Sequence, residues 1–262
     1  MKEIRFYYKL IYMHILSAVE YKGWWLMLIH VLFYVLLEPF GTVMMFLRFG
    51  SIGTWTMERI LLVYALAVTS FGIAKTFLRG FDTFPSKMVR GGDFDRLLLR
   101  PKSLFTQTAA STFHLYRLSQ PLSGIAIIIW CLIKLDISLT PLNLFVLITA
   151  LIGGTVTYAG VFVMTSGIAF FTVKAVEWIY VFTNASYQVT RIPHEYIPGI
   201  LKHVYTFWVP MLVISYYPAS AICDWNEPLW TGFLALPAGL VVFGASMFVW
   251  RFGIRHYRST GS

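Results

Sequence analysis

The sequence predicts an all-α, polytopic integral membrane protein. We expect six transmembrane helices, an N-terminal amphipathic interfacial helix, and a re-entrant helical hairpin between the last two spans. The 262 residues are 58% hydrophobic and only 13% charged, whereas a soluble domain carries roughly 25% charged residues. Several apolar runs also reach the length of about 20 residues that a bilayer span requires.

Residues 1–22 predict a helix that lies along the membrane surface instead of crossing it. Apolar residues recur at helical spacing from Ile4 onward, and Lys2, Arg5 and Lys9 lie on the opposite side. A helix with one apolar and one basic face binds at the boundary between headgroups and acyl chains. We therefore expect an interfacial helix on the cytoplasmic side.

Five apolar runs then predict transmembrane spans. They cover residues 24–47, 57–78, 104–133, 142–172 and 229–252. The largest polar stretch, residues 79–102, follows the second run and holds six Lys or Arg residues and three Asp residues. Short loops rich in Lys and Arg stay on the cytoplasmic side, so we expect this loop and both termini in the cytoplasm.

Two segments compete for the remaining crossing, residues 174–192 and residues 199–222. With both termini on one side the number of crossings must be even, so only one of the two crosses. The second segment is more apolar but contains Pro210 and Pro218, and irregular backbone at membrane depth survives only where protein or a cavity covers it. We expect 174–192 to cross and 199–222 to be re-entrant, with the reverse assignment open and residues 1–262 forming one domain.

No motif in the sequence predicts catalysis or metal binding. A phosphate-binding loop of the type G-x-x-x-x-G-K-[ST] is missing, and His194-Glu195 has no second histidine at the spacing of zinc proteases. We expect no catalytic residue, no metal site and no cofactor in this chain, which is therefore not an enzyme by itself. The net charge of +9 suits anionic headgroups and cytoplasmic loops, so no nucleic-acid partner is expected.

The most informative segment is GGDFDRLLLRP, Gly91–Pro101, within the cytoplasmic loop. Asp93 can cap a helix that Pro101 ends. The apolar residues that share one face of this helix are Phe94, Leu97 and Leu98. A helix of about two turns, residues 93–99, is unstable alone and needs a surface to dock on. That surface is either a partner protein, or the membrane and the neighbouring spans.

This segment resembles a known family. The pattern G-x-F-D-x-L-L-x-R-P is similar to that in permeases of type-2 ABC exporters, as are the segments IPHEYIPGIL and YYPA and the terminal GIRHYRSTGS. The residues that the resemblance assigns to coupling with an ATPase are Gly92, Asp93, Phe94, Asp95, Leu97, Leu98, Arg100 and Pro101.

The resemblance implies a function for the whole chain. In that family six spans form half of a transmembrane dimer, a re-entrant hairpin follows the fifth span, and a separate ATPase subunit binds ATP and Mg. It implies a permease subunit of an exporter in the plasma membrane of a prokaryote, paired with a sister permease or with a second copy. The substrate is not indicated. The alternative is a stand-alone ion-coupled carrier, which should show paired repeats that this sequence lacks.

A polar stripe is predicted on the first span, where residues four apart are His30, Tyr34, Glu38 and Thr42. A charge at mid-membrane costs roughly 2.5–3.5 kcal/mol, so Glu38 should face protein or water. The stripe is either a hydrogen-bonded seam between helices or a lining of the transport path that responds to protons.

Small residues on the fourth span predict close helix packing. Gly153, Gly160 and Gly167 recur every seven residues, and such a face lets another helix approach closely. A gating role is the alternative.

Overall fold

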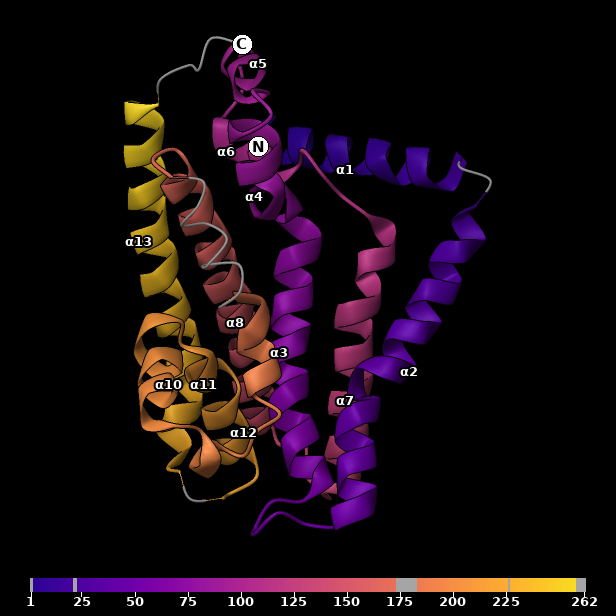
Figure 1. Cartoon of the computed structure of the whole chain (residues 1–262). Coiled ribbons are helices and arrows are strands. Elements are labelled where there is room, and N and C mark those ends of the chain that lie inside the picture. Colours follow the sequence, from indigo (N-terminus) through magenta and orange to yellow (C-terminus); the bar gives the residue numbers. More distant parts are fainter. Residues whose placement is uncertain (1, 21–22, 173–182, 226, 258–262) are drawn as a thin grey trace.

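A computed structural model describes residues 2–20, 23–172, 183–225 and 227–257, which fold into a bundle of helices (Figure 1). Within these ranges the one strand-like feature is an isolated bridge between Ile52 and Trp55. The helices long and apolar enough to cross a membrane are Met57–Phe77, Leu115–Lys134, Pro141–Ala169 and Leu229–His256. These findings confirm a polytopic helical membrane protein, while six crossings and the hairpin remain predictions.

Helix α1, Lys2–Glu20, lies across one end of the bundle, at a steep angle to the long helices (Figure 1). Helix α2, Trp24–Phe49, runs from that end to the opposite end, and α3, Met57–Phe77, returns. The turn between them places Gly50 and Gly53 at φ values of 71° and 60°, a region that favours glycine because a Cβ would clash there. The chain thus comes back to the α1 end before the polar stretch begins.

Residues 79–109 fold into short helices at the α1 end (Figure 1). These are α4 (Arg79–Phe84), the π-helix η1 (Pro85–Val89), α5 (Phe94–Leu98) and α6 (Leu104–Ala109). The stretch expected to be a loop with one helix is therefore mostly helical, and all of it stays at one end of the bundle.

The continuous helix predicted over residues 104–133 is wrong, because the chain is broken after α6. The 3-10 turn η2 (Leu115–Leu118) leads into α7 (Ser119–Lys134), which is the membrane-length part of this region.

Local hydrogen bonding explains this break. Serine and threonine side chains bond to nearby backbone groups and so compete with a regular helix. Here the Ser111 hydroxyl donates to the Thr108 carbonyl at 2.9 Å. A second bond comes from α1, since Nε2 of His14 donates to the Ala110 carbonyl oxygen at 3.2 Å. The backbone released by the break is thereby satisfied by side chains.

Helices α8 (Pro141–Ala169) and α13 (Ala235–His256) pack against each other along most of their length. The three glycines of α8 face the α13 backbone. A Cβ added to Gly153 would lie 2.4 Å from the Ala235 carbonyl oxygen. A Cβ added to Gly160 would lie 3.0 Å from the Phe243 nitrogen, and one added to Gly167 would lie 2.9 Å from the Trp250 nitrogen. Residue numbers rise together along the two helices, so α8 and α13 run parallel.

Helix α13 contributes a matching small-residue series, which the sequence analysis missed. Gly239, Ser246 and Gly253 recur at the same seven-residue spacing. An added Cβ would lie 2.4 Å from the Gly153 carbonyl oxygen at Gly239, and 2.6 Å from the Gly167 carbonyl oxygen at Gly253. The interface is therefore built from two complementary faces, as expected where packing rather than hydrophobic expulsion joins helices.

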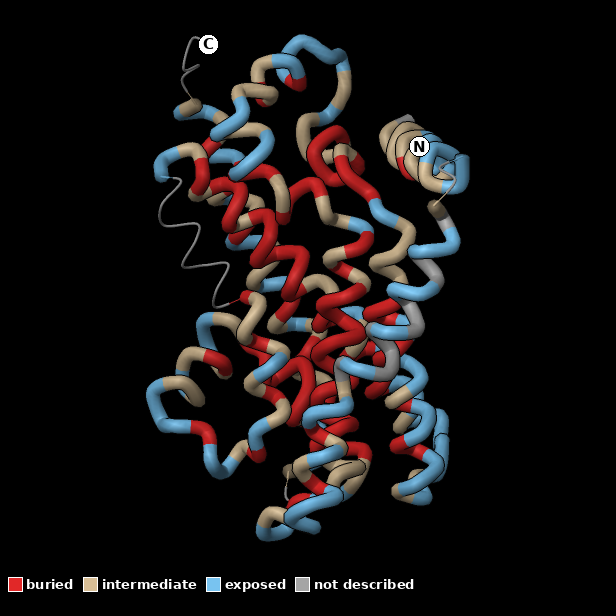
Figure 2. Tube along the Cα trace, turned by 45° about the vertical axis from the view of Figure 1, so that its right-hand side comes forward, coloured by how far each residue is buried: buried red, intermediate tan, exposed pale blue. Residues whose placement is uncertain are grey.

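Burial separates an inner from an outer set of helices. Helices α3 and α8 are largely buried, whereas α13 and α7 expose much of their apolar surface (Figure 2). On α13, for example, Val241 and Phe248 are each 72% exposed. Apolar faces of this kind suit contact with lipid or with another membrane protein.

Residues 183–234 are broken into short pieces: those from α10 to η5 lie at the end of the bundle away from α1 (Figure 1), whereas residues 183–189 lie beside α3, where Asn184 accepts a bond from Lys75. A helix over residues 183–189 is followed by η3 (His194–Tyr196), α10 (Gly199–His203), η4 (Val204–Trp208), α11 (Met211–Ile214), α12 (Tyr216–Ile222) and η5 (Leu229–Leu234). Residues 174–182 of the crossing predicted over 174–192 lie outside the described residues.

Candidate functional site

The candidate coupling segment lies at the same end of the bundle as α1, beside the ends of α8 and α13 (Figure 1). Its helix α5 covers Phe94–Leu98, one residue shorter at each end than expected. Gly92 has a φ of 73°, so glycine is required at the turn into the helix. Arg96 pairs with Asp93 at 3.2 Å, and both side chains are well exposed.

Phe94 anchors α5 to the rest of the chain. Its ring is fully buried and its centroid lies 5.4 Å from that of Phe84, 5.0 Å from Phe170 and 4.8 Å from Tyr257. Phe170 follows the last residue of α8, and Tyr257 follows the last residue of α13. The coupling segment is therefore fixed to the ends of the two paired helices, and Leu97, 7% exposed, faces inward as well.

The outward face of the segment consists of other residues. Leu98 is 47% exposed and Leu99 is 86% exposed, and Arg100 and Pro101 are also exposed. Leu99 lies off the stripe of Phe94, Leu97 and Leu98 that the spacing predicts, so helical periodicity alone gives no reason to select it. Its unusual exposure makes it the clearest apolar contact point of the segment.

The segment is tied to α6 through one side chain. Nε2 of the buried Gln107 donates to the Lys102 carbonyl at 2.9 Å and to the Leu97 carbonyl at 3.3 Å. Between α1, η1, α5 and α6 lies a cavity of about 370 Å³. The charged and polar residues that line it are His14, Asp93, Arg96, Arg100, Gln107 and Ser111. The cavity can therefore receive polar side chains of a partner.

Helix α1 is attached to this region by specific contacts. The Tyr7 hydroxyl donates to the Phe77 carbonyl at 2.6 Å, which satisfies a carbonyl that the end of α3 leaves without a helical partner. Burial, and then the neighbouring Tyr8, raise the pKa of Tyr7 to about 12, so its proton stays available for this bond. Together with the bond from His14 to the break after α6, this contact joins α1 to α3 and α6.

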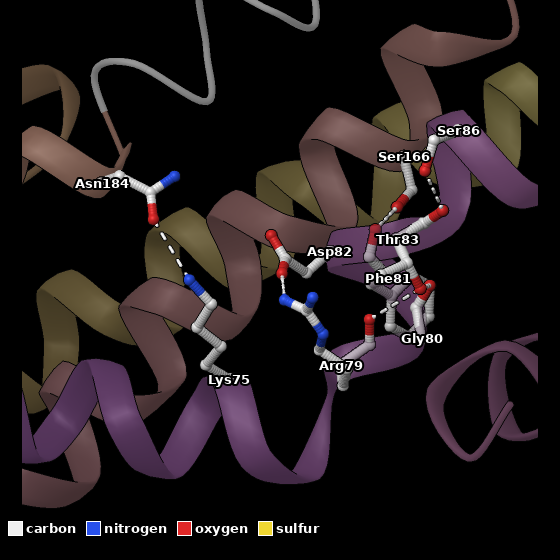
Figure 3. Close-up of polar contacts among 9 residues, drawn as sticks. All are labelled: Lys75, Arg79, Gly80, Phe81, Asp82, Thr83, Ser86, Ser166 and Asn184. Carbon is white, nitrogen blue, oxygen red and sulfur yellow. Dashed lines mark hydrogen bonds and ion pairs between the residues drawn. The ribbon is translucent and has the colours of Figure 1, made fainter. Parts of the chain in front are cut away.

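Helix α4 is held between α6 and α8. A Cβ on Gly80 would lie 1.6 Å from the Thr108 carbonyl oxygen, so the two backbones nearly touch. On the other side, the Ser166 hydroxyl donates to the Phe81 carbonyl at 2.8 Å (Figure 3). The Arg79 guanidinium pairs with the buried Asp82 carboxylate. This packing makes α4 a rigid base for the coupling segment.

The predicted polar stripe lies on α2, and the structure describes only part of it. His30 is exposed, and its ring centroid lies 5.0 Å from that of Tyr116. Thr42 is buried, with 6% exposure. The side chains of Tyr34 and Glu38 are outside the part that the structure describes. Both interpretations of the stripe therefore stay predictions.

A search for metal sites finds no group of three or more His, Cys, Asp or Glu side chains among the described residues. The comparisons with known proteins give one match. A family described as ABC-2 family transporter protein matches residues 31–261. No curated protein and no solved structure matches the chain.

Proposed function

Since the chain belongs to the ABC-2 family of transporter proteins, we propose that it is the transmembrane permease subunit of an ATP-driven exporter. It forms part of the translocation path and couples to a separate ATPase subunit. ATP and Mg bind to that ATPase subunit, and this chain supplies no cofactor site of its own.

The observation that carries the proposal is the two-sided character of the coupling segment. Its inner side, Phe94 and Leu97, is buried against the ends of α8 and α13, while its outer side presents Leu98 and Leu99. Exposed leucines beside cations form an apolar patch with a charged rim. A surface of this kind is typical of a contact with a protein partner. A partner that moves Leu99 therefore moves α8 and α13.

The crossing number and orientation belong to the same proposal. Helices α8 and α13 run parallel, so the chain between them must return once to the opposite end. A crossing by residues 174–192 supplies that return, and the short helices of 199–222 then form the re-entrant element. This gives six crossings, with both termini and residues 79–102 in the cytoplasm of a prokaryotic cell.

A second permease subunit completes the path. The exposed apolar faces of α13 and α7 leave room for one, and a cavity of about 600 Å³ lined by Pro237, Val241 and Trp230 lies on the outer side of α13. The resemblance in sequence favours a sister permease over a second copy of this chain.

Purification in a mild detergent tests the proposal. We expect the chain to co-purify with a subunit that hydrolyses ATP, and Leu99→Asp to abolish that association. Leu139→Asp is the matched control, because Leu139 is 62% exposed but lies in the turn between α7 and α8, at the far end of the bundle. Transport by the purified chain without any ATPase would instead favour an ion-coupled carrier.

A further inference from the structure

A second polar site lies inside the bundle, at the level where α3 ends. It is a cavity of about 270 Å³ between α2, α3, the η2–α7 junction and the helix over residues 183–189. The polar residues that line it are His30, Lys75, Tyr116, Arg117, Ser119 and Gln120.

Lys75 reaches this cavity from the last turn of α3. Its ammonium group donates to the Asn184 side-chain oxygen at 3.1 Å (Figure 3) and lies 4.7 Å from the centroid of the Phe71 ring. Asn184 is neutral, so this bond leaves the charge of Lys75 uncompensated. No carboxylate of the described residues lies within ion-pair distance of it.

Arg117 adds a second cation from η2. Its guanidinium carbon lies 5.4 Å from the Tyr116 ring centroid. Its Nε is buried, and no hydrogen-bond acceptor reaches it from the described residues. A buried N–H without an acceptor costs free energy, and an anion in the cavity would supply that acceptor.

Among the residues that the structure describes, the charge balance around the cavity is positive. The carboxylate of Asp82 lies in this region, and it already pairs with Arg79. Lys75 and Arg117 thus stand as two further cations in a partly buried site. Burial first, and then the Arg117 and Arg79 guanidinium groups, lower the pKa of the neighbouring His114.

The depth of the site indicates the kind of anion. Lys75 lies two residues before Phe77, whose carbonyl accepts the bond from Tyr7 of the interfacial helix. If α1 lies at the headgroup level, the cavity lies just beneath it. Basic pockets between transmembrane helices on the cytoplasmic side suit anionic headgroups, and the rings of Phe71, Tyr116 and Tyr187 supply an apolar wall.

We propose that this cavity binds a phosphate or carboxylate group carried by a membrane amphiphile. Lys75 and Arg117 compensate the negative charge, while Gln120 and Ser119 offer further hydrogen bonds. Binding itself does not depend on an ATPase; only a role for the bound amphiphile as transported substrate rests on the proposed function.

Equilibrium binding to the purified full chain in a neutral detergent tests the site. The probes are phosphatidylglycerol, the zwitterionic phosphatidylcholine and inorganic phosphate. We expect phosphatidylglycerol to bind at least tenfold more tightly than phosphatidylcholine, and Lys75→Gln or Arg117→Gln to weaken it about tenfold, since each removes one charge-assisted bond. Lys134→Gln, at the exposed far end of α7, should bind like the wild type.

Competition by inorganic phosphate identifies the source of the anion. If inorganic phosphate displaces phosphatidylglycerol, the site recognises the anionic group alone. If phosphate does not displace it, the acyl chains are also needed for binding. Either result agrees with a site for an anionic group. Lys75→Arg, which keeps the charge, should retain binding and controls for misfolding. Equal affinity for the two lipids, or wild-type affinity in both Gln variants, would overturn the proposal while leaving the exporter function standing.

Discussion

Replacement of Gly153 by alanine tests the close contact between α8 and α13. The added Cβ would lie 2.4 Å from the Ala235 carbonyl oxygen, whereas ordinary contacts of a Cβ begin at 3.4 Å. The two backbones must therefore separate by about 1 Å, and no flexible side chain can absorb the overlap. Overpacking typically costs about 1–3 kcal/mol, against which alanine regains about 1 kcal/mol of helix propensity. We expect Gly153→Ala to lower the free energy of unfolding by up to about 2 kcal/mol, and not to raise it.

The matched control lies in the same helix pair. Nothing approaches within 4 Å of a Cβ placed on Gly244 of α13, so Gly244→Ala should gain about 1 kcal/mol from helix propensity alone. The measurement is denaturant unfolding of the purified chain in detergent, followed by circular dichroism. Equal stabilisation by both substitutions would refute the close approach of the two backbones and would reopen the gating interpretation of the α8 glycines.

Four further predictions concern other parts of the chain. Phe94→Ala empties a fully buried site and should cost about 3–5 kcal/mol of stability, measured by the same unfolding assay. Tyr7→Phe removes the bond to the Phe77 carbonyl and should cost about 1 kcal/mol, with faster proteolysis of α1. Burial, and then Lys202, lower the pKa of His194 from 6.5 to about 4. Between these two pH values the unfolded chain binds more protons than the folded chain, so the free energy of unfolding should fall as the pH drops from 6.5 towards 4. His194→Gln should flatten this dependence of stability on pH. Glu38→Gln should leave the pH profile of transport unchanged if the polar stripe is a seam between helices, and a shifted profile would favour the proton-sensitive path.

The sequence predicted the helical membrane fold because apolar length alone decides whether a helix can cross a bilayer. The three glycines of α8 recur at a seven-residue spacing that can be seen without knowledge of the partner, and in the structure they lie against the α13 backbone. The break after Ala109 was not predicted: besides the local bond from Ser111 to Thr108, the Ala110 carbonyl is satisfied by His14, 96 residues away. Periodicity within one segment carries no information about such a contact.

The direction in which the coupling segment faces also could not be predicted from the spacing of its residues. Spacing placed Phe94, Leu97 and Leu98 on one face, but a stripe can face its own chain or a partner equally well. The rings of Phe170 and Tyr257, contributed by distant parts of the chain, decide that Phe94 turns inward. Because Phe94 turns inward, Leu99 lies on the exposed side of the segment. Lys75 and Arg117 likewise form one site only because α3 and η2 meet in the fold.

The parallel pairing of α8 and α13 has a mechanical consequence. Helix α8 has 29 residues, which corresponds to a rod of about 44 Å. Its glycines bring the backbones of α8 and α13 into direct contact, so a tilt of α8 about a pivot at the Phe94 rings would carry α13 with it. A tilt of about 5° at that pivot displaces the far ends by about 4 Å, more than the diameter of a water molecule of about 2.8 Å. In the proposed exporter, the length of the pair would therefore turn a small rotation at the Phe94 end into a larger displacement at the opposite end.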